Sequence, residues 1–600
     1  MSENDGAHGV SDATRHDDKA TGDSAVTRET EGSAGTADDV RAADRSGRIV
    51  QGDSGPVEPT DGARRPGRPG DGSPQSVAAG SLDDSLAAHE RAPRRHRRRW
   101  PWVVLAALVV VAVVVSLLVV RARRTSSSAS PADTVGIGLK LAPTNLDIRN
   151  QSGSALDQVL IGNVYQGLVA RDSSNTVIPS LATSWTTSSD GRTYVFRLRH
   201  GVTFSNGDAL DADDVVWSIR QLIGKQYVDA SLLKNFSSIE AVDAHTVKIV
   251  LTKPYADLLW VLAGRPGLVF DKDADYDART SAVGSGPYTV SSFRSGTSIT
   301  LKANPRYKGD DKARTRTIVL RYYTDDNAAV NALKSGDVQV LAPVSQNLAS
   351  TFSQDTAHYT VKVGDGTDKY VLAFNGKGKA TSDKRVRQAL RYAIDSDELI
   401  AARGGVDKAL GGPIPSLDPG YVDLTGLYPH DEAKARALLA RAGYDSDHPL
   451  RLTLTYANIY GTEIGQQLKT QLARVGVKLT VDVVEFATWL QNVYTNHDYD
   501  LSLVDHNESH DFYQWTDADY YYGYDNATVR SLYEQAMAST DAATMNSLLA
   551  KAARIVSEDA PADWLFNYRI STAWAKGVTG FPVNLNQTLM PLWKVAYRME

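Results

Sequence analysis

The stretch NVYQGLVARDSSNTVIPSLATSWTTSSDGRTYVFRLRHGVTFSNGDALDADDVVWSIRQL (163–222) combines strand and helix patterns in one short segment. The Asp-Gly pair at 190–191 predicts a hairpin turn between two strands, because this pair readily takes positive φ values. The Asn-Gly pair at 206–207 predicts a second turn, and a helix follows it near Asp211. The segment therefore predicts a hairpin that leads into a helix.

The same alternation of strands and helices continues through the chain beyond residue 133. Several of the helix patterns have an acidic first turn or cap and end at a glycine, as helix termini prefer. Mixed strands and helices over this length predict an α/β protein. The predicted strands lie at 135–140, 194–199, 245–251, 298–303, 317–323, 450–456 and 477–486, and the predicted helices at 211–223, 326–336, 383–394, 395–402, 431–443 and 463–476.

The first part of the chain has a different composition. Residues 1–99 contain almost no large apolar side chain and show neither a helical nor a strand period. Such a segment cannot bury enough surface to offset the entropy of ordering it, so we expect a disordered tail. This tail is acidic as far as Glu90 and then basic from Arg91 to Arg99.

An apolar stretch follows the basic residues: WVVLAALVVVAVVVSLLVV (102–120), in which Ser116 is the only polar side chain. Its length fits a helix that crosses a bilayer, so we predict a transmembrane helix over 100–121 and a linker over 122–132. Six arginines lie between residues 91 and 99, before the apolar span, and three follow the span. This excess of positive charge before the span places the N-terminus in the cytoplasm and the folded part outside. A cleaved signal peptide is the alternative, but the long apolar run and the basic residues after it favour a retained anchor.

The chain contains no cysteine, and its formal net charge is −6. A disulfide framework, a cysteine metal site, a thiol nucleophile and a lipid-modified cysteine are therefore excluded for this sequence, which leaves the apolar helix as the predicted membrane tether. No basic stripe indicates a nucleic-acid partner, and we expect neither a cofactor nor a bound metal.

Enzyme motifs give little support to a catalytic function. The sequence lacks HExxH, GxSxG and GxxxxGK[ST], the patterns of zinc proteases, nucleophile-elbow hydrolases and P-loop enzymes. The segment 231–234 matches SxxK and 334–336 resembles KTG, but no SxN lies between them. His506 and His510 stand among acidic residues, where irregular loop spacing favours a polar loop over a metal site.

Ordered motifs along the chain carry a resemblance to a known family. The first segment contains YxGL, PSLAxSW, the Asp-Gly hairpin and AxDV at the start of a helix. The pattern continues through GSGPY (284–288), NPRYKG (304–309), ALKSGDV (332–338) and DKRVRQALRYAID (383–395). Together these motifs resemble the signature of family 5 extracellular solute-binding proteins, the peptide- and nickel-binding receptors of ABC importers, over 133–600.

The resemblance implies an α/β fold of two hinged lobes, like that of periplasmic binding proteins, with an extra subdomain. Such receptors close on a solute by hinge motion, and catalysis is not expected. We expect a monomer that passes its solute to the permease subunits of an ABC importer. By analogy the first lobe comprises 133–172, 284–372 and 571–600, the extra subdomain 173–283, and the second lobe 373–570.

The resemblance also implies a ligand site in the segment 499–512. Peptide-binding members hold an extended peptide by its main chain, in the manner of strand addition. Leu501 and Leu503 would offer backbone groups to the peptide, and Asp505 would offer its carboxylate to the α-ammonium group. The family's proline is replaced here by Ser509, and the tryptophan usually found before the aspartate is absent, which leaves the ligand class open.

Other residues and functions remain open at this point. Phe486 resembles an aromatic residue that walls the family's cleft, although a core role fits equally well, and Ser152 with Gly153 corresponds to the part of the first lobe that faces the ligand. A receptor for another solute, such as an oligosaccharide or a metal chelate, is one alternative, because the tyrosine-rich run 519–524 could stack on sugars. A membrane-anchored solute sensor is the other.

Overall fold

The structure, a computed structural model, describes residues 132–584 and 588–599. Within these ranges no helix has both the length and the apolar character needed to cross a bilayer. The tail expected over 1–99, the span expected over 100–121 and all of the expected linker except Ala132 lie outside the described residues.

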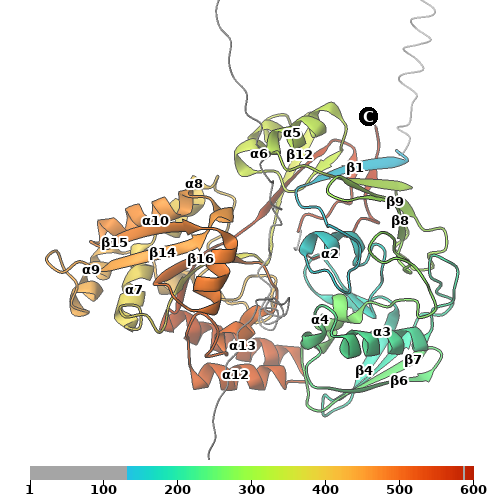
Figure 1. The fold of residues 1–600 in the computed structure, drawn as a ribbon, viewed down its shortest axis with the longest axis horizontal. Helices are drawn as coiled ribbons and strands as arrows, with labels where there is room; N and C mark the ends of the chain where they lie inside the picture. Colours follow the sequence, from blue (N-terminus) through green and yellow to red (C-terminus); the bar gives the residue numbers. More distant parts are fainter. Residues whose placement is uncertain (1–131, 585–587, 600) are drawn as a thin grey trace, which may run out of the picture. The chain divides into compact units, whose positions relative to one another are not determined.

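A mixed seven-stranded sheet forms the part that we call lobe I. Its central strand β1 pairs in parallel with β10 and β11, and the outer strands pair antiparallel with their neighbours. The strand order is β12 (Tyr359–Gly364), β18 (Ile570–Ala575), β11 (Val340–Leu341), β1 (Thr134–Leu139), β10 (Thr317–Tyr322), β9 (Ser298–Ala303) and β8 (Tyr288–Arg294). Helices α2 (Ser154–Leu160), α5 (Asp326–Ser335) and α6 (Gln346–Ser353) and the short pair β19 (Val578–Thr579) and β20 (Ala596–Tyr597) complete this part (Figure 1).

An antiparallel four-stranded sheet forms the extra subdomain, in the order β4 (Ala182–Thr187), β5 (Thr193–Leu198), β7 (Thr246–Leu251) and β6 (Phe236–Asp243). Helices α3 (Ala212–Lys225) and α4 (Leu258–Leu262) pack on it and share one apolar core with it, and the hairpin of β2 (Val169–Arg171) and β3 (Val177–Pro179) adds to this core. Gly191 has a φ of 67° in the β4–β5 turn, which confirms the predicted hairpin.

A five-stranded sheet forms lobe II, in the order β15 (Lys478–Val484), β14 (Arg451–Ala457), β16 (Leu501–His506), β13 (Lys369–Phe374) and β17 (Ala562–Asn567). One face packs on α7 (Lys384–Ala393), α8 (Ser396–Ala402), α9 (Glu432–Arg441) and α10 (Glu463–Arg474). The other face packs on α11 (Phe486–Trp489), the π-helix Leu490–Thr495, and the helices α12 (Ala527–Met537) and α13 (Ala542–Asp559), which lie side by side (Figure 1). Short 3-10 helices occur at Ala230–Leu232, Arg265–Gly267, Thr425–Leu427, Asn458–Tyr460 and Asp511–Trp515.

The chain passes between the two larger sheets twice. It leaves lobe I after β12 and enters lobe II at β13, so the first crossing lies at 365–368, and it returns between β17 and β18 at 568–569. The boundary expected between 372 and 373 therefore falls inside β13, because every residue of this strand pairs with β16. Two short segments therefore join the two larger sheets.

Within the described residues, each strand and helix predicted beyond residue 133 is present, with small shifts at the ends. The aspartates before the helices explain why the starts were predictable. Asp211 accepts a hydrogen bond from the N–H of Asp213, and Asp214 closes a capping box with it. The side chains of Asp325, Asp383, Asp395 and Asp431 cap α5, α7, α8 and α9 in the same way.

Candidate ligand-binding site

The backbone of β16 is oriented as the proposed strand addition requires. In the ladder with β13, Asn375 donates its N–H to the carbonyl of Asp500 across 3.0 Å. Hydrogen-bonded pairs alternate with other pairs along an antiparallel ladder. Leu501, Leu503 and Asp505 therefore direct their N–H and C=O groups away from β13, toward the side of β14.

Strand β14 pairs with only the first residue of β16 on the side that faces away from β13. The register joins β14 to β16 at one pair, Leu454 with Leu501, and β14 otherwise pairs with β15. The backbone of Leu503 and Asp505 therefore faces a side on which β14 no longer pairs. The side chains of Leu501 and Leu503 are fully buried in the lobe II core, so only their backbone is available to a ligand.

Asp505 has a carboxylate with unused hydrogen-bonding capacity. Its Oδ1 atom is buried and has no hydrogen-bond partner among the described residues. Burial raises the pKa of Asp505 well above its usual range, and the nearby carboxylate of Asp368 raises that pKa further. The cations of Lys369 and Arg403 act in the opposite direction. Arg403 is engaged elsewhere, since its Nε donates to Asp407 Oδ2 across 2.7 Å.

Aromatic side chains surround this carboxylate. Tyr370 stands opposite Asp505 in the β13–β16 ladder, and its ring lies 4.7 Å from Phe566 and 5.9 Å from Tyr460, centroid to centroid. Burial, followed by the charge of Asp505, raises the pKa of Tyr370 and of Tyr460. Burial of a carboxylate among aromatic rings strengthens electrostatic attraction, so the arrangement suits a cationic hydrogen-bond donor.

Sequence reasoning did not find Tyr370, Tyr460 or Arg403 as neighbours of Asp505. They come from the first strand of lobe II, the turn after β14 and the end of α8. Residues so far apart meet only through the strand order of the sheet, and none of them lies in a recognisable motif. No local signal in the sequence could have identified them.

Phe486 packs in a different part of lobe II from the surroundings of Asp505. Phe486 begins α11, is half-buried, and its ring lies 5.8 Å from that of Trp489. It packs against the core on the face of the sheet opposite to the side chains of Leu501 and Leu503. The core role that the sequence left open therefore has contacts to support it, and a role in walling the cleft stays a prediction.

Ser152 and Gly153 lie in lobe I, just before α2. Gly153 precedes the helix with a φ of 127°, and its carbonyl accepts a hydrogen bond of 3.3 Å from Arg265. Ser152 is exposed. Within the described residues no hydrogen bond joins this loop to Asp505, so its part in ligand binding stays a prediction.

The tyrosine-rich run does not form a sugar-stacking surface. Tyr520, Tyr521, Tyr522 and Tyr524 are all at most 8% exposed and belong to the core between the sheet and α12 and α13. The expectation that the run could stack on an oligosaccharide is wrong, because the aromatic faces are covered by neighbouring side chains.

His506 belongs to the same buried cluster. Its Nε2 lies 3.0 Å from the hydroxyl of Tyr521 and 2.7 Å from that of Tyr522. Burial, and then the charge of Lys369, lowers the pKa of His506 to about 3, so the ring is neutral at pH 7. In the described part of the chain, no group of three or more His, Asp or Glu side chains is arranged to hold a metal ion.

Comparison with known proteins decides the family. A sequence model described as bacterial extracellular solute-binding proteins, family 5 Middle, matches residues 176–531, which is more than half of the chain. This chain belongs to family 5 of the bacterial extracellular solute-binding proteins. The resemblance seen in the sequence is thereby confirmed, and a family 5 protein is a binding protein and not an enzyme.

Two curated relatives illustrate what this family 5 protein is similar to. It is 29% identical over 408 residues to di/tripeptide-binding protein 2 of Pseudomonas aeruginosa. The alignment covers 62% of this chain and 75% of the relative. It is also 29% identical over 467 residues to the glutathione-binding protein GsiB of Pectobacterium atrosepticum. This alignment covers 73% of this chain and 90% of the relative.

Solved structures confirm the two-lobed α/β fold of the family 5 protein. The substrate-binding protein CtaP of Listeria monocytogenes aligns with a TM-score of 0.70 at 22% identity, over 78% of this chain and 100% of the other. The binding protein DppA of Helicobacter pylori, solved in complex with the peptide STSA, aligns with a TM-score of 0.64 at 22% identity, over 78% and 98%.

Proposed function

We propose that this chain captures short peptides by their free amino terminus and presents them to the permease of an ABC importer. The observation that carries the proposal is the buried Oδ1 of Asp505, which has no hydrogen-bond partner among the described residues and lies at the end of β16. A peptide ammonium group would supply the missing donor and a compensating positive charge.

The backbone of β16 supports the same ligand. A peptide that lies beside Leu503 would complete backbone hydrogen bonds that β14 leaves unmade, and main-chain recognition tolerates different ligand side chains. The relatives named for di- and tripeptide binding and for glutathione binding point in the same direction. Closure of the lobes on the peptide through the crossings at 365–368 and 568–569 would complete the site.

The alternative ligands have less support from the described residues. The oligosaccharide alternative rested on the tyrosine-rich run, which is buried. A metal chelate held directly by protein side chains would need an arranged cluster of ligands, and the described ranges contain none. A peptide is therefore the solute that the geometry favours.

The decisive experiment compares free and N-acetylated forms of one peptide by calorimetry. The peptide is chosen first from a panel of di-, tri- and tetrapeptides by thermal shift. Asp505→Asn keeps the shape of the side chain and removes its charge. The parent should prefer the free amine by about 30-fold to several thousand-fold, and Asp505→Asn should lose most of this preference.

Asp310→Asn is the matched control, because Asp310 is an exposed carboxylate of lobe I that pairs with Arg199 of the extra subdomain. This variant should keep the full preference for the free amine. If the parent and Asp505→Asn showed the same preference, the assignment of Asp505 to the peptide amino terminus would be wrong.

The sequence further supports a membrane tether through 102–120, with the N-terminus in the cytoplasm and a monomeric binding part outside. Protease added to intact cells should remove the part after residue 133 and spare the tail before Arg91. Loss of the tail instead would reverse the orientation, and a mature protein that begins near Pro131 would show that the apolar segment is a cleaved signal.

A further inference from the structure

The loop after β16 connects lobe II to the extra subdomain. Ser509 donates its hydroxyl to the carboxylate of Asp418, and it accepts a hydrogen bond of 2.6 Å from Nδ2 of Asn175. Asn175 also donates to Asp418 Oδ1 across 3.1 Å. Asn175 lies in the turn of the β2–β3 hairpin, whereas Asp418 and Ser509 belong to lobe II. We call Asn175, Asp418 and Ser509 the interlobe latch.

The geometry of the latch is fixed from both sides. Arg171 donates to Oδ1 of Asn175 across 2.9 Å, which orients the amide so that its Nδ2 points to Asp418 and Ser509. On the other side, the backbone N–H of His510 donates to Asp418 Oδ2 across 2.9 Å. Asn175 and Asp418 are each only 7% exposed, so these hydrogen bonds are shielded from water.

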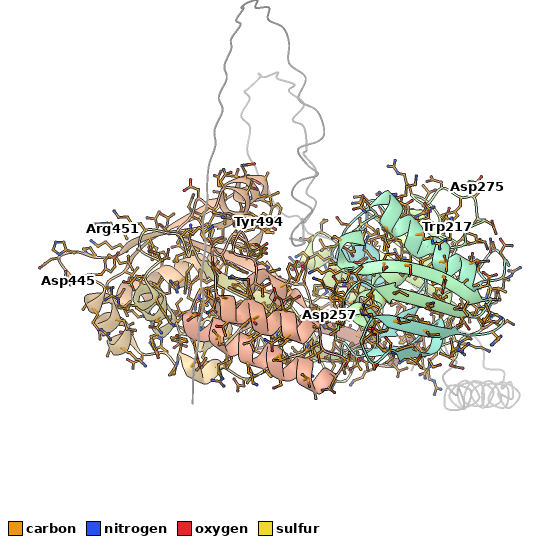
Figure 2. The ribbon with its side chains drawn as sticks, turned by 90° about the horizontal axis from the view of Figure 1, so that it is seen from below. Trp217, Asp257, Asp275, Asp445, Arg451 and Tyr494 are labelled. Atoms are coloured by element: carbon orange, nitrogen blue, oxygen red, sulfur yellow. The ribbon has the colours of Figure 1, made fainter. Side chains whose placement is uncertain are left out.

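A second contact lies beside the latch. The ring of His510 stacks on Trp260 of α4, with centroids 4.1 Å apart, and its Nδ1 lies 3.0 Å from Asp257 Oδ1. Arg171 lies over the same indole, 4.7 Å from its centroid, so it joins the two contacts. Figure 2 shows Asp257 at the edge of the subdomain, where Ala256 donates its N–H to the carbonyl of Met537 at the end of α12.

The contacts of Asn175 with Asp418 and Ser509, those of His510 with Asp257 and Trp260, and that of Ala256 with Met537 join the subdomain to lobe II. These bonds can form only when the subdomain and lobe II are together, and separation would expose their polar groups to water. Their free energy therefore favours the joined arrangement whatever ligand is bound, and apparent affinity depends on the fraction of molecules in that arrangement. The position of Ser509, where the family pattern has proline, matters because proline has no hydroxyl with which to make these bonds.

We propose that Ser509 and Asn175 set the affinity of this protein for its ligand without touching the ligand, by holding the extra subdomain against lobe II. The inference rests on the proposed peptide-binding function for its affinity measurement only. The latch itself is tested by a distance measurement that needs no ligand.

The distance measurement uses paired spin labels in the full chain. The protein has no cysteine, so Lys225→Cys at the end of α3 and Lys469→Cys in α10 give one labelled site in the subdomain and one in lobe II. Both lysines are exposed. Without added peptide, the parent should show one main distance between the two labels. Asn175→Gly and Ser509→Ala should each shift part of the population to distances longer than that of the parent.

A matched glycine variant separates loss of the latch from a general loss of stability of the subdomain. Asn175 has a φ of 65°, which glycine adopts readily, so Asn175→Gly removes the amide and keeps the backbone. Asn235→Gly is the matched control, since Asn235 has a φ of 61° in the same subdomain and takes no part in the latch. If Asn175→Gly and Ser509→Ala gave the same distance distribution as the parent and Asn235→Gly, the latch would be refuted.

The affinity measurement uses the peptide identified for the Asp505 experiment. Asn175→Gly and Ser509→Ala should each weaken binding about 5- to 50-fold and keep the preference for a free amino terminus. The double variant should lose little more than either single variant, because both remove the same contact. Unchanged affinity in a protein whose label distances lengthen would overturn the link to affinity. A chain that binds none of the peptides would refute the proposed function, and the distance result would still decide the latch.

Discussion

Lys369 Nζ lies 3.0 Å from Asp511 Oδ2, and both side chains are buried. Lys369 is the first residue of β13, directly after the first crossing, and its ammonium group also donates to the carbonyl of Glu508 across 2.7 Å. This ion pair therefore fastens the loop that carries Ser509 and His510 to the start of β13. The loop that contacts the subdomain is thereby tied to the segment about which the lobes would move.

Replacement of this lysine should destabilise lobe II. Lys369→Met would leave the buried carboxylate of Asp511 without its cation, which costs about 3 to 5 kcal/mol in the free energy of unfolding. Urea unfolding measures the loss. Lys140→Met is the matched control, because Lys140 pairs with Asp326 at the surface and its loss should cost at most about 1 kcal/mol. Equal costs for the two variants would show that burial of the pair contributes nothing.

Peptide binding should weaken in acid. The ammonium group needs an ionised Asp505, whose pKa is raised by burial and by Asp368 and lowered by Lys369 and Arg403. As the pH falls through that raised pKa, protons compete with the ligand, and affinity should fall by up to about tenfold per pH unit. Calorimetry between pH 8 and pH 4.5 should show this fall in the parent and not in Asp505→Asn.

The raised pKa of Asp505 also predicts how the stability of the ligand-free protein depends on pH. Because the pKa of Asp505 is raised on folding, the folded state holds the proton more tightly than the unfolded state does. The resulting stability is complete below the unfolded pKa of about 4 and is lost as the pH rises through the folded pKa. Melting temperatures of the parent relative to Asp505→Asn should therefore decrease from pH 4 upward, and an increase would contradict the assigned direction.

Two glycines should respond oppositely to alanine. A Cβ on Gly284 would lie 2.1 Å from the carbonyl oxygen of Val164, so Gly284→Ala should destabilise the protein by about 3 kcal/mol or more. Gly224 lies in α3 and its Cβ would meet open space, so Gly224→Ala should raise stability by roughly 0.5 to 1 kcal/mol. Thermal unfolding of both variants measures the difference. A harmless Gly284→Ala would contradict the close backbone approach.

The start of α3 should depend on one acceptor. Asp211→Ala removes the side chain that caps the helix and should cost about 1 kcal/mol, seen as a lower melting temperature. Asp211→Asn keeps an oxygen that can accept the same hydrogen bond and should retain most of the stability. If the asparagine variant lost as much as the alanine variant, the charge and not the cap would be responsible.

Local features of the sequence were predictable because their causes are local. Asp211 caps the helix that follows it, and Gly191 supplies the positive φ of its own hairpin. Gly284 and Gly286 stand in a motif of the sequence, but the reason for glycine at these positions is not local. They let the backbone approach Val164 and Asn163, a contact with a distant segment that no local pattern encodes.

The sequence by itself determined the α/β class, the helix starts, the hairpins and the family, because these depend on neighbours within a few residues or on motifs that stand in a fixed order. Only the tertiary structure decided what surrounds Asp505 and what Ser509 contacts. Tyr370 and Asp505 meet through the strand order of one sheet, and Asn175 and Ser509 meet across two lobes. Burial, which raises the pKa of Asp505 and excludes water from the latch, is a property of the packed chain and has no counterpart in the order of residues.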